Sequence, residues 1–211
     1  RQRARRVDSL NGVRLSTLPT VAAQVDAASQ MVTSASPRPE FLYSHMPLPI
    51  HTRMGDAVGY TTLLRNPVRR FSAYYHWCLL HKGRDFHWMS PAIRDGATLE
   101  EFADYVLQTR SYPGGFQPCE YFVNAWAQMG LVPDHLSGNQ FEIARHVLET
   151  YFQVIGITEF FDETLYVLSR LLGMHEPPRW KMRGKSGSPT ETPARAAAKI
   201  MELMSADCQL Y

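Results

Sequence analysis

The segment YTTLLRNPVRRFSAYYHW, residues 60–77, constrains the fold of this chain more than any other. Residues 61–64 form a short apolar run with β-branched content, which predicts a buried strand. Asn66 and Pro67 then predict a turn and the start of a helix, because proline is tolerated where its missing N–H would have no partner. The segment therefore predicts a strand followed directly by an aromatic helix.

The junction between this strand and this helix predicts an anion site. Arg65 ends the strand with a guanidinium group that can bind a phosphate through two hydrogen bonds. The helix start adds free backbone N–H groups and the positive end of the helix dipole, and Ser72 adds a hydroxyl donor. An ordinary strand–turn–helix with surface arginines shows the same local pattern, so both interpretations stay open on these residues alone.

A family resemblance favours the anion site. TLLRNPVRRFSAYY, residues 62–75, resembles the T-L-L-R-D-P-x-x-R-x-x-S-x-Y-Y segment of sulfotransferases that use 3′-phosphoadenosine 5′-phosphosulfate, in particular the carbohydrate type related to heparan sulfate 2-O-sulfotransferase and its bacterial relatives. The resemblance implies that Arg65 and Ser72 hold the 3′-phosphate of the nucleotide. Asn66 replaces the usual aspartate, and Ser72 comes one residue early, which is about 100° around a helix. Either the helix starts differently here or Ser72 does not reach the phosphate.

A histidine upstream fits the same family. FLYSHMPLPIHTRMGDAVGY, residues 41–60, predicts a short strand ending at His45, a proline-containing loop and a short helix. It resembles the G-H-x-P segment of the family, and His45 precedes Arg65 by twenty positions. The resemblance implies that His45 is the general base for the acceptor hydroxyl, a role that suits an imidazole with an ordinary pKa near 6.5. A structural histidine at a strand end is the alternative.

A third match lies further along the chain. VIGITEFFDETLYVLSRLLGM, residues 154–174, resembles the V-G-x-x-E-x-x-x-E-S-L-x-x-L segment of the family. It predicts a core strand and then an amphipathic helix over residues 160–172. Glu159, at the end of this strand, is expected to be a cap or a salt-bridge partner rather than a catalyst.

The phosphate loop of the family has no counterpart in this chain. That loop has the form P-K-T-G-x-T/S, and its amides and lysine hold the 5′-phosphosulfate; no such string occurs here. We therefore expect a fragment, with the resemblance covering residues 40–211; the alternative is a protein that has lost the loop and its activity. The basic stretch WKMRGKSGSP, residues 180–189, resembles a loop that closes over the nucleotide, which implies a cofactor-binding role for Lys185. A surface loop is the alternative.

The expected elements alternate between strands and helices, which predicts an α/β fold with a parallel sheet flanked by helices on both faces. For this family that is a P-loop NTPase-like sulfotransferase fold, incomplete at the N-terminus. We expect one domain over residues 1–211, with a helical segment at residues 1–39. The expected strands are residues 41–44, 60–64 and 153–157, and the expected helices are residues 15–31, 67–80, 98–108, 119–129, 140–151, 160–172 and 194–204.

The composition excludes several classes of protein. Hydrophobic residues make up 45% of the chain and charged residues 20%, which is ordinary for a soluble globular protein. A net charge of +2 does not indicate a nucleic-acid binder. Three cysteines allow one disulfide but no disulfide framework. No histidine or cysteine spacing gives a clean metal-ligand set, so no metal is expected, and no apolar run is long enough to span a membrane, so membrane association is expected only through a segment not present.

The resemblance implies transfer of a sulfuryl group from 3′-phosphoadenosine 5′-phosphosulfate to a hydroxyl of a carbohydrate acceptor, a glycan or polysaccharide. The transfer needs no metal, and the compartment would be the Golgi lumen in a eukaryote and the cytoplasm in a bacterium. One alternative is a non-catalytic nucleotide- or glycan-binding relative. Another is a P-loop kinase fragment, which would need a G-x-x-x-x-G-K-S/T string that is absent here.

Overall fold

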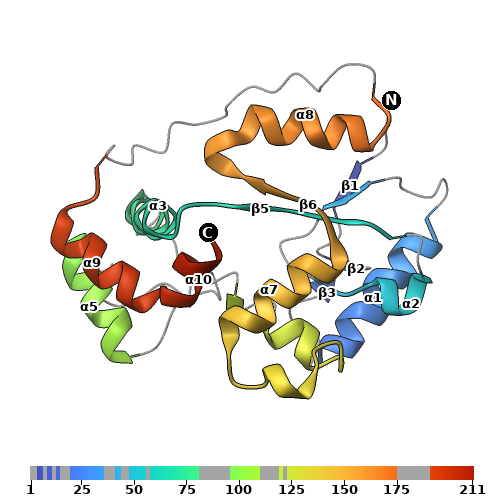
Figure 1. Cartoon of the computed structure of the whole chain (residues 1–211), viewed down its shortest axis with the longest axis horizontal. Helices are drawn as coiled ribbons and strands as arrows, with labels where there is room; N and C mark the ends of the chain where they lie inside the picture. The colour runs from blue at the N-terminus through green and yellow to red at the C-terminus, as the bar shows by residue number, and fades with distance from the viewer. Residues whose placement is uncertain are drawn as a thin grey trace. The chain divides into compact units, whose positions relative to one another are not determined.

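The computed structural model is mostly helical, with small two-stranded sheets (Figure 1). It describes residues 4–6, 9–10, 13–14, 20–35, 41–43, 48–55, 58–80, 96–109, 119–120, 123–174 and 191–211.

The chain packs as two compact units, each built from two segments. Unit 1 comprises Arg1–Tyr60 and Cys119–Phe152, and unit 2 comprises Thr61–Pro118 and Gln153–Tyr211. Each unit has its own buried apolar cluster. The assignment of residues 1–211 to one domain stays a prediction.

Unit 1 combines short strands with helices. Thr20 caps the first of these helices, because its hydroxyl oxygen accepts a hydrogen bond from the backbone N–H of Ala23 at 3.1 Å. The helix expected over residues 119–129 contains a π-helical turn. The elements are β1 (Ala4–Arg6), which pairs in parallel with β4 (Phe41–Tyr43), β2 (Ser9–Leu10), which pairs antiparallel with β3 (Val13–Arg14), α1 (Val21–Thr33), α2 (His51–Met54), the π-helical turn η3 (Val123–Ala127), η4 (Asp134–Leu136) and α7 (Gln140–Tyr151).

Aromatic side chains gather around Tyr60 in unit 1. The rings of His51 and Trp126 stack with their centroids 5.5 Å apart, and Tyr60 meets Trp126 edge-on at 5.4 Å. The Tyr60 hydroxyl accepts a hydrogen bond from the backbone N–H of His51 at 2.9 Å and lies 3.0 Å from His51 Nδ1. Burial raises the pKa of Tyr60 to about 12, although the His51 N–H bond acts in the opposite direction.

This shifted tyrosine predicts a fall in stability at alkaline pH. Between pH 10 and about 12 the unfolded chain releases the Tyr60 proton and the folded chain keeps it, so the free energy of unfolding decreases as the pH rises, by about 2 kcal/mol. Urea unfolding at a series of pH values should show that Tyr60→Phe is less stable at neutral pH but loses less stability above pH 10. Parallel pH profiles for the two proteins would show that Tyr60 is not buried in this way.

Unit 2 contains the strand–turn–helix that was expected from residues 60–77, apart from Tyr60, which belongs to unit 1. Its strand and its helix have the predicted bounds, Tyr60–Leu64 and Pro67–Leu80. Thr98 and Glu101 form a capping box, because each side chain accepts a hydrogen bond from the other residue's backbone N–H. The elements are β5 (Tyr60–Leu64), α3 (Pro67–Leu80), α5 (Leu99–Thr109), β6 (Phe152–Ile157), the turn η5 (Thr158–Phe160), α8 (Phe161–Leu171), α9 (Ala194–Leu203) and α10 (Ser205–Leu210).

Strands β5 and β6 form a two-stranded sheet. At their first residues, the rings of Tyr60 and Phe152 lie 5.4 Å apart. At their far ends, the hydroxyl of Thr158 donates a hydrogen bond to the carbonyl of Leu64 at 2.8 Å. Since the starts are neighbours and the ends are neighbours, the pair is parallel. The predicted α/β character is confirmed to this extent, while the expected sheet with helices on both faces stays a prediction.

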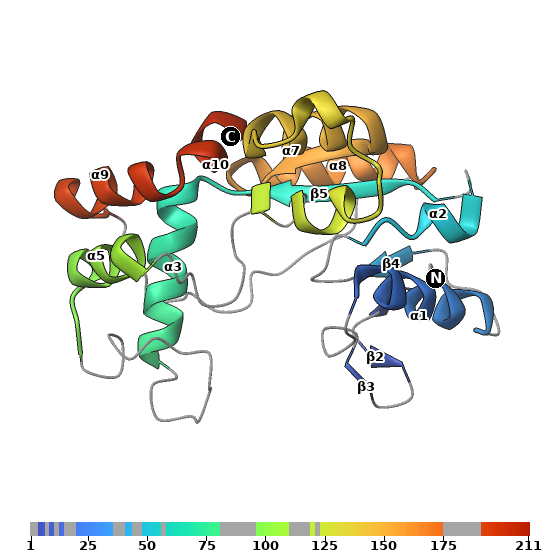
Figure 2. The ribbon, with the colours of Figure 1, turned by 90° about the horizontal axis from the view of Figure 1, so that it is seen from below.

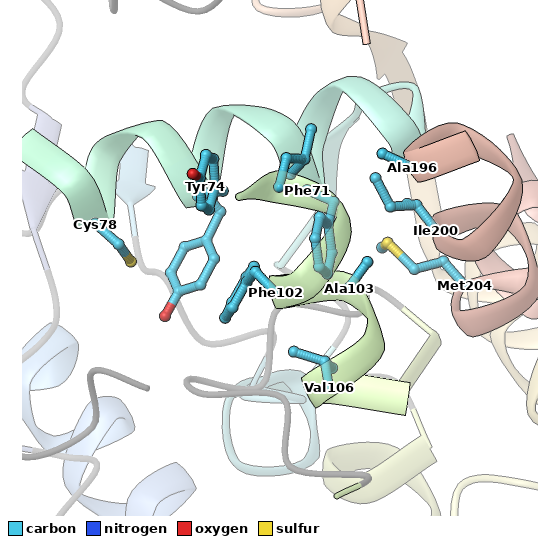
Figure 3. Packing of buried hydrophobic residues seen from close by; sticks show 11 residues of the cluster. Phe71, Tyr74, Cys78, Phe102, Ala103, Val106, Ala196, Ile200 and Met204 are labelled. Atoms are coloured by element: carbon cyan, nitrogen blue, oxygen red, sulfur yellow. The ribbon is translucent and has the colours of Figure 1, made fainter. Parts of the chain in front are cut away.

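The core of unit 2 lies between α3, α5 and α9. Figure 3 shows the side chains of these helices pointing toward one another, with the rings of Phe71 and Phe102 5.3 Å apart. Lys199 of α9 also pairs with two carboxylates of α5, Glu100 at 3.1 Å and Asp104 at 2.6 Å. Helix α3 begins where β5 ends and runs across the direction of that strand (Figure 2). The core therefore holds α3 with its N-terminus at the ends of the parallel strands.

Candidate anion site at the start of α3

Two of the four predicted site residues fall within the described residues. Arg65 follows β5 directly and is half-buried. Ser72 lies in α3, with 4% of its surface exposed. His45 and Lys185 lie outside the described residues, so the roles expected for them stay predictions.

A small pocket lies at the start of α3 in unit 2. It has a volume of about 10 Å³, which is room for one water molecule. Arg65 lines it and Ser72 does not, so this pocket does not bring the two predicted residues together. The lining residues are Leu64, Arg65, Pro67, Arg70, Met204, Asp207, Leu210 and Tyr211.

The charged side chains that line this pocket are Arg65, Arg70 and Asp207. Two arginines and one aspartate among the lining residues give the lining a net positive formal charge. Asp207, on α10, has only 4% of its surface exposed. Such a lining attracts anions, and the arginine forks suit the geometry of a phosphate or sulfate.

Most of the backbone N–H groups at the start of α3 already have hydrogen-bond partners. The side-chain oxygen of Asn66 accepts a hydrogen bond from the backbone N–H of Arg69 at 3.1 Å, and the carbonyl of Asn66 accepts from the N–H of Arg70 at 2.8 Å. Pro67 has no N–H to offer. The free backbone donors expected from the sequence are therefore mostly in use, and an anion here depends chiefly on the arginine side chains.

Two residues that follow β6 contact the backbone on either side of Arg65. Thr158 donates to the carbonyl of Leu64, as described above, and Glu159 Oε1 accepts a hydrogen bond from the backbone N–H of Asn66 at 3.3 Å. Glu159 was expected to be a cap or a salt-bridge partner, and its contact with the backbone N–H of Asn66 agrees with the first of these. Burial raises the pKa of the Tyr211 phenol, and the nearby Glu159 carboxylate raises it further.

Ser72 takes part in a contact within α3. Its backbone carbonyl accepts a hydrogen bond from Nδ1 of His76 at 2.7 Å. A carbonyl can only accept, so the proton of this imidazole is on Nδ1. The contact of the Ser72 hydroxyl with a phosphate stays a prediction.

The sequence did not point to Arg70, Asp207 and Tyr211 as pocket residues. Arg70 belongs to the same motif as Arg65, and counting one helical turn from the helix start would have suggested it. Asp207 and Tyr211 are far away in the sequence, and no local pattern brings them to this pocket.

Within the described ranges, no three His, Cys, Asp or Glu side chains are placed to hold a metal ion together. None of the helices described combines the length and the apolar character needed to cross a bilayer. The three cysteines, Cys78, Cys119 and Cys208, are free thiols.

Comparison of the chain with models of known protein families and with curated protein sequences gives no match. The assignment of a function therefore depends on the residues and geometry of the site.

Proposed function

We propose that this chain belongs to a sulfotransferase that moves a sulfuryl group from 3′-phosphoadenosine 5′-phosphosulfate to a carbohydrate hydroxyl. The observation that carries the proposal is the arginine pair, Arg65 and Arg70, in a net-positive pocket at the start of α3. This pocket lies where two parallel strands end, which is where open α/β sheets bind their ligands. The fold proposed for the complete protein is the P-loop NTPase-like sulfotransferase fold.

In the proposed reaction, Arg65 holds the 3′-phosphate of the nucleotide, with Ser72 and Lys185 as further contacts. The acceptor oxygen attacks sulfur while the bond from sulfur to the 5′-phosphate oxygen breaks. His45 takes the proton of the acceptor hydroxyl, and 3′-phosphoadenosine 5′-phosphate leaves. Positive groups stabilise the charge that collects on the transferred group and on the leaving oxygen, and the reaction needs no metal.

Binding of the nucleotide requires the pocket to open. A volume of about 10 Å³ holds one water molecule and excludes a phosphate group. Asp207, Leu210 and Tyr211 form the part of the lining contributed by α10 and the residue after it. Movement of this segment, or of its side chains, is therefore part of the proposal.

The first test is calorimetric titration of the chain with 3′-phosphoadenosine 5′-phosphate and, separately, with adenosine 5′-phosphate. We expect micromolar binding of the first nucleotide and binding of the second that is weaker by about tenfold or more, because the arginine pair has no 3′-phosphate to hold. Equal binding of the two nucleotides, or no binding by a folded chain, would contradict the proposal.

A second candidate is a non-catalytic nucleotide- or glycan-binding relative. It is favoured by the lack of a P-K-T-G-type loop in this sequence. The two candidates differ in transfer of radiolabelled sulfuryl groups from the donor nucleotide to polysaccharide acceptors. Binding without transfer, in a protein that includes any residues preceding Arg1, would favour the second candidate.

A further inference from the structure

Two consecutive residues after β6 contact the backbone on both sides of Arg65. The Thr158 hydroxyl donates a hydrogen bond to the carbonyl of Leu64 at 2.8 Å. The Glu159 carboxylate accepts one from the N–H of Asn66 at 3.3 Å. Leu64 and Asn66 are the immediate neighbours of Arg65. The same short turn, η5, therefore contacts the peptide group before Arg65 and the peptide group after it.

We infer that Thr158 and Glu159 are positioning residues that aim the Arg65 guanidinium into the pocket and so set the affinity for a 3′-phosphate. The inference rests on the proposed function. It adds to that function two residues that need not touch the nucleotide themselves.

The position of an arginine fork depends on its backbone. Recognition of a phosphate through two parallel hydrogen bonds needs the guanidinium in one orientation, and errors of about 1 Å are enough to weaken such a site. The strand β5 ends at Leu64, so the hydrogen-bond ladder of the strand does not include Arg65. The bonds from Thr158 and Glu159 supply the constraint that the end of the strand lacks.

The same contact also fixes the start of α3. Asn66, whose N–H donates to Glu159, is the residue that caps Arg69 and whose carbonyl accepts from the N–H of Arg70. Loss of the Glu159 contact would therefore loosen the backbone of both pocket arginines, Arg65 and Arg70. The contact made by this one carboxylate therefore affects both arginines of the pocket lining.

The surroundings of the Glu159 carboxylate indicate whether its acceptor oxygen or its charge matters for the pocket. Its second oxygen, Oε2, is buried. The Tyr211 phenol is close to this carboxylate, whose charge and side-chain hydrogen bond raise the pKa of the phenol. The negative charge of Glu159 opposes binding of an anion nearby. What Glu159 contributes to the pocket is therefore its acceptor oxygen and not its charge.

This distinction gives the test. Glu159→Ala removes the acceptor, whereas Glu159→Gln keeps an acceptor oxygen and removes the charge. In titrations with 3′-phosphoadenosine 5′-phosphate, we expect Glu159→Ala to bind about tenfold more weakly and Glu159→Gln to bind as tightly as the wild type or more tightly. Thr158→Val should weaken binding and Thr158→Ser should not. Glu163→Ala, which removes an exposed carboxylate of α8, is the control for charge alone.

Two measurements without ligand check the contact itself. Amide hydrogen exchange at Asn66 should become faster in Glu159→Ala and remain slow in Glu159→Gln. The pKa of Tyr211, followed by NMR of labelled tyrosine, should fall in both variants, because both lose the carboxylate charge.

Three results would overturn the inference. A folded Glu159→Ala protein with wild-type affinity would show that Arg65 needs no such support. A Glu159→Gln protein as weak as Glu159→Ala would show that the acceptor oxygen is not what matters. Failure of the wild type to bind the nucleotide would overturn the proposed function, and this inference with it; that case is recognised because it appears before any substitution is made.

Discussion

An Arg65→Ala variant is expected to bind 3′-phosphoadenosine 5′-phosphate about a hundredfold more weakly than the wild type. Arg65 lines the net-positive pocket at the start of α3, and a bidentate contact with a phosphate consists of two charge-assisted hydrogen bonds. At about 1.5 kcal/mol each, their loss amounts to about 3 kcal/mol, or about two orders of magnitude in the dissociation constant. Isothermal titration calorimetry at constant ionic strength measures the difference.

The matched control is Arg145→Ala. Arg145 is exposed and belongs to an ion pair with Glu142 on α7, with 2.6 Å between the paired atoms. It is absent from the lining of the pocket, so its loss changes the net charge by the same amount without touching the site. Binding of adenosine 5′-phosphate should be almost unchanged in Arg65→Ala. An equal loss of affinity for both nucleotides, or an equal loss in both variants, would show that Arg65 does not recognise the 3′-phosphate.

The strand–turn–helix around Arg65 could be predicted from the sequence because its signals are local. The apolar run before Arg65, the Asn66-Pro67 pair and the aromatic residues after it each fix the backbone over a few residues, and β5 and α3 have the predicted bounds. The capping box at Thr98 and Glu101 is local in the same way.

The pocket itself could not be predicted, because distant segments complete it. Asp207 and Tyr211 line it together with Arg65, and only tertiary packing brings them there. The same holds for the hydrogen bond from Asn66 to Glu159, which joins residues 93 positions apart. The sequence predicted a cap or a salt-bridge partner at Glu159 but did not indicate which residue it contacts.

The position of Ser72 shows what a motif alone leaves open. Ser72 comes one residue early against the family pattern, and a different helix start was one explanation. Helix α3 begins at Pro67, as the sequence predicts, so the helix start does not compensate for the shift. Arg70 lines the pocket, whereas Ser72 is buried and does not line it.

A Gly156→Ala variant is expected to lose about 3 kcal/mol of stability. Gly156 lies in β6, and a Cβ atom there would overlap the side chain of Thr164 on α8 and would lie 2.8 Å from Cδ2 of Leu63. Thr164 cannot easily turn away, because its hydroxyl accepts from the N–H of Ile157 at 3.3 Å and donates to the carbonyl of Phe160 at 2.9 Å. A β-branched side chain in a helix also has few rotamers available. Relief therefore requires α8 to move away from the sheet.

Thermal or urea unfolding measures this loss, which for a chain of this size corresponds to a fall in Tm of about 6–12 °C. The double variant Gly156→Ala/Thr164→Ser is the decisive comparison. Serine keeps the hydroxyl and its bonds but lacks the methyl group Cγ2, whose overlap with the new Cβ is the closest. Part of the lost stability should return in the double variant, whereas Thr164→Ser alone should not stabilise the protein. Equal stability of Gly156→Ala and the wild type would show that α8 does not pack on β6 at this position.

The same substitution links the packing of α8 to the anion site. Thr158 and Glu159 follow β6 directly and precede α8, so a displacement of that helix would pull on the residues that hold the backbone around Arg65. Gly156→Ala should therefore weaken binding of 3′-phosphoadenosine 5′-phosphate even at temperatures where the variant is folded, and Thr164→Ser should restore affinity together with stability. Recovery of stability without recovery of affinity would mean that η5 keeps its position when α8 moves, and that the two effects have separate causes.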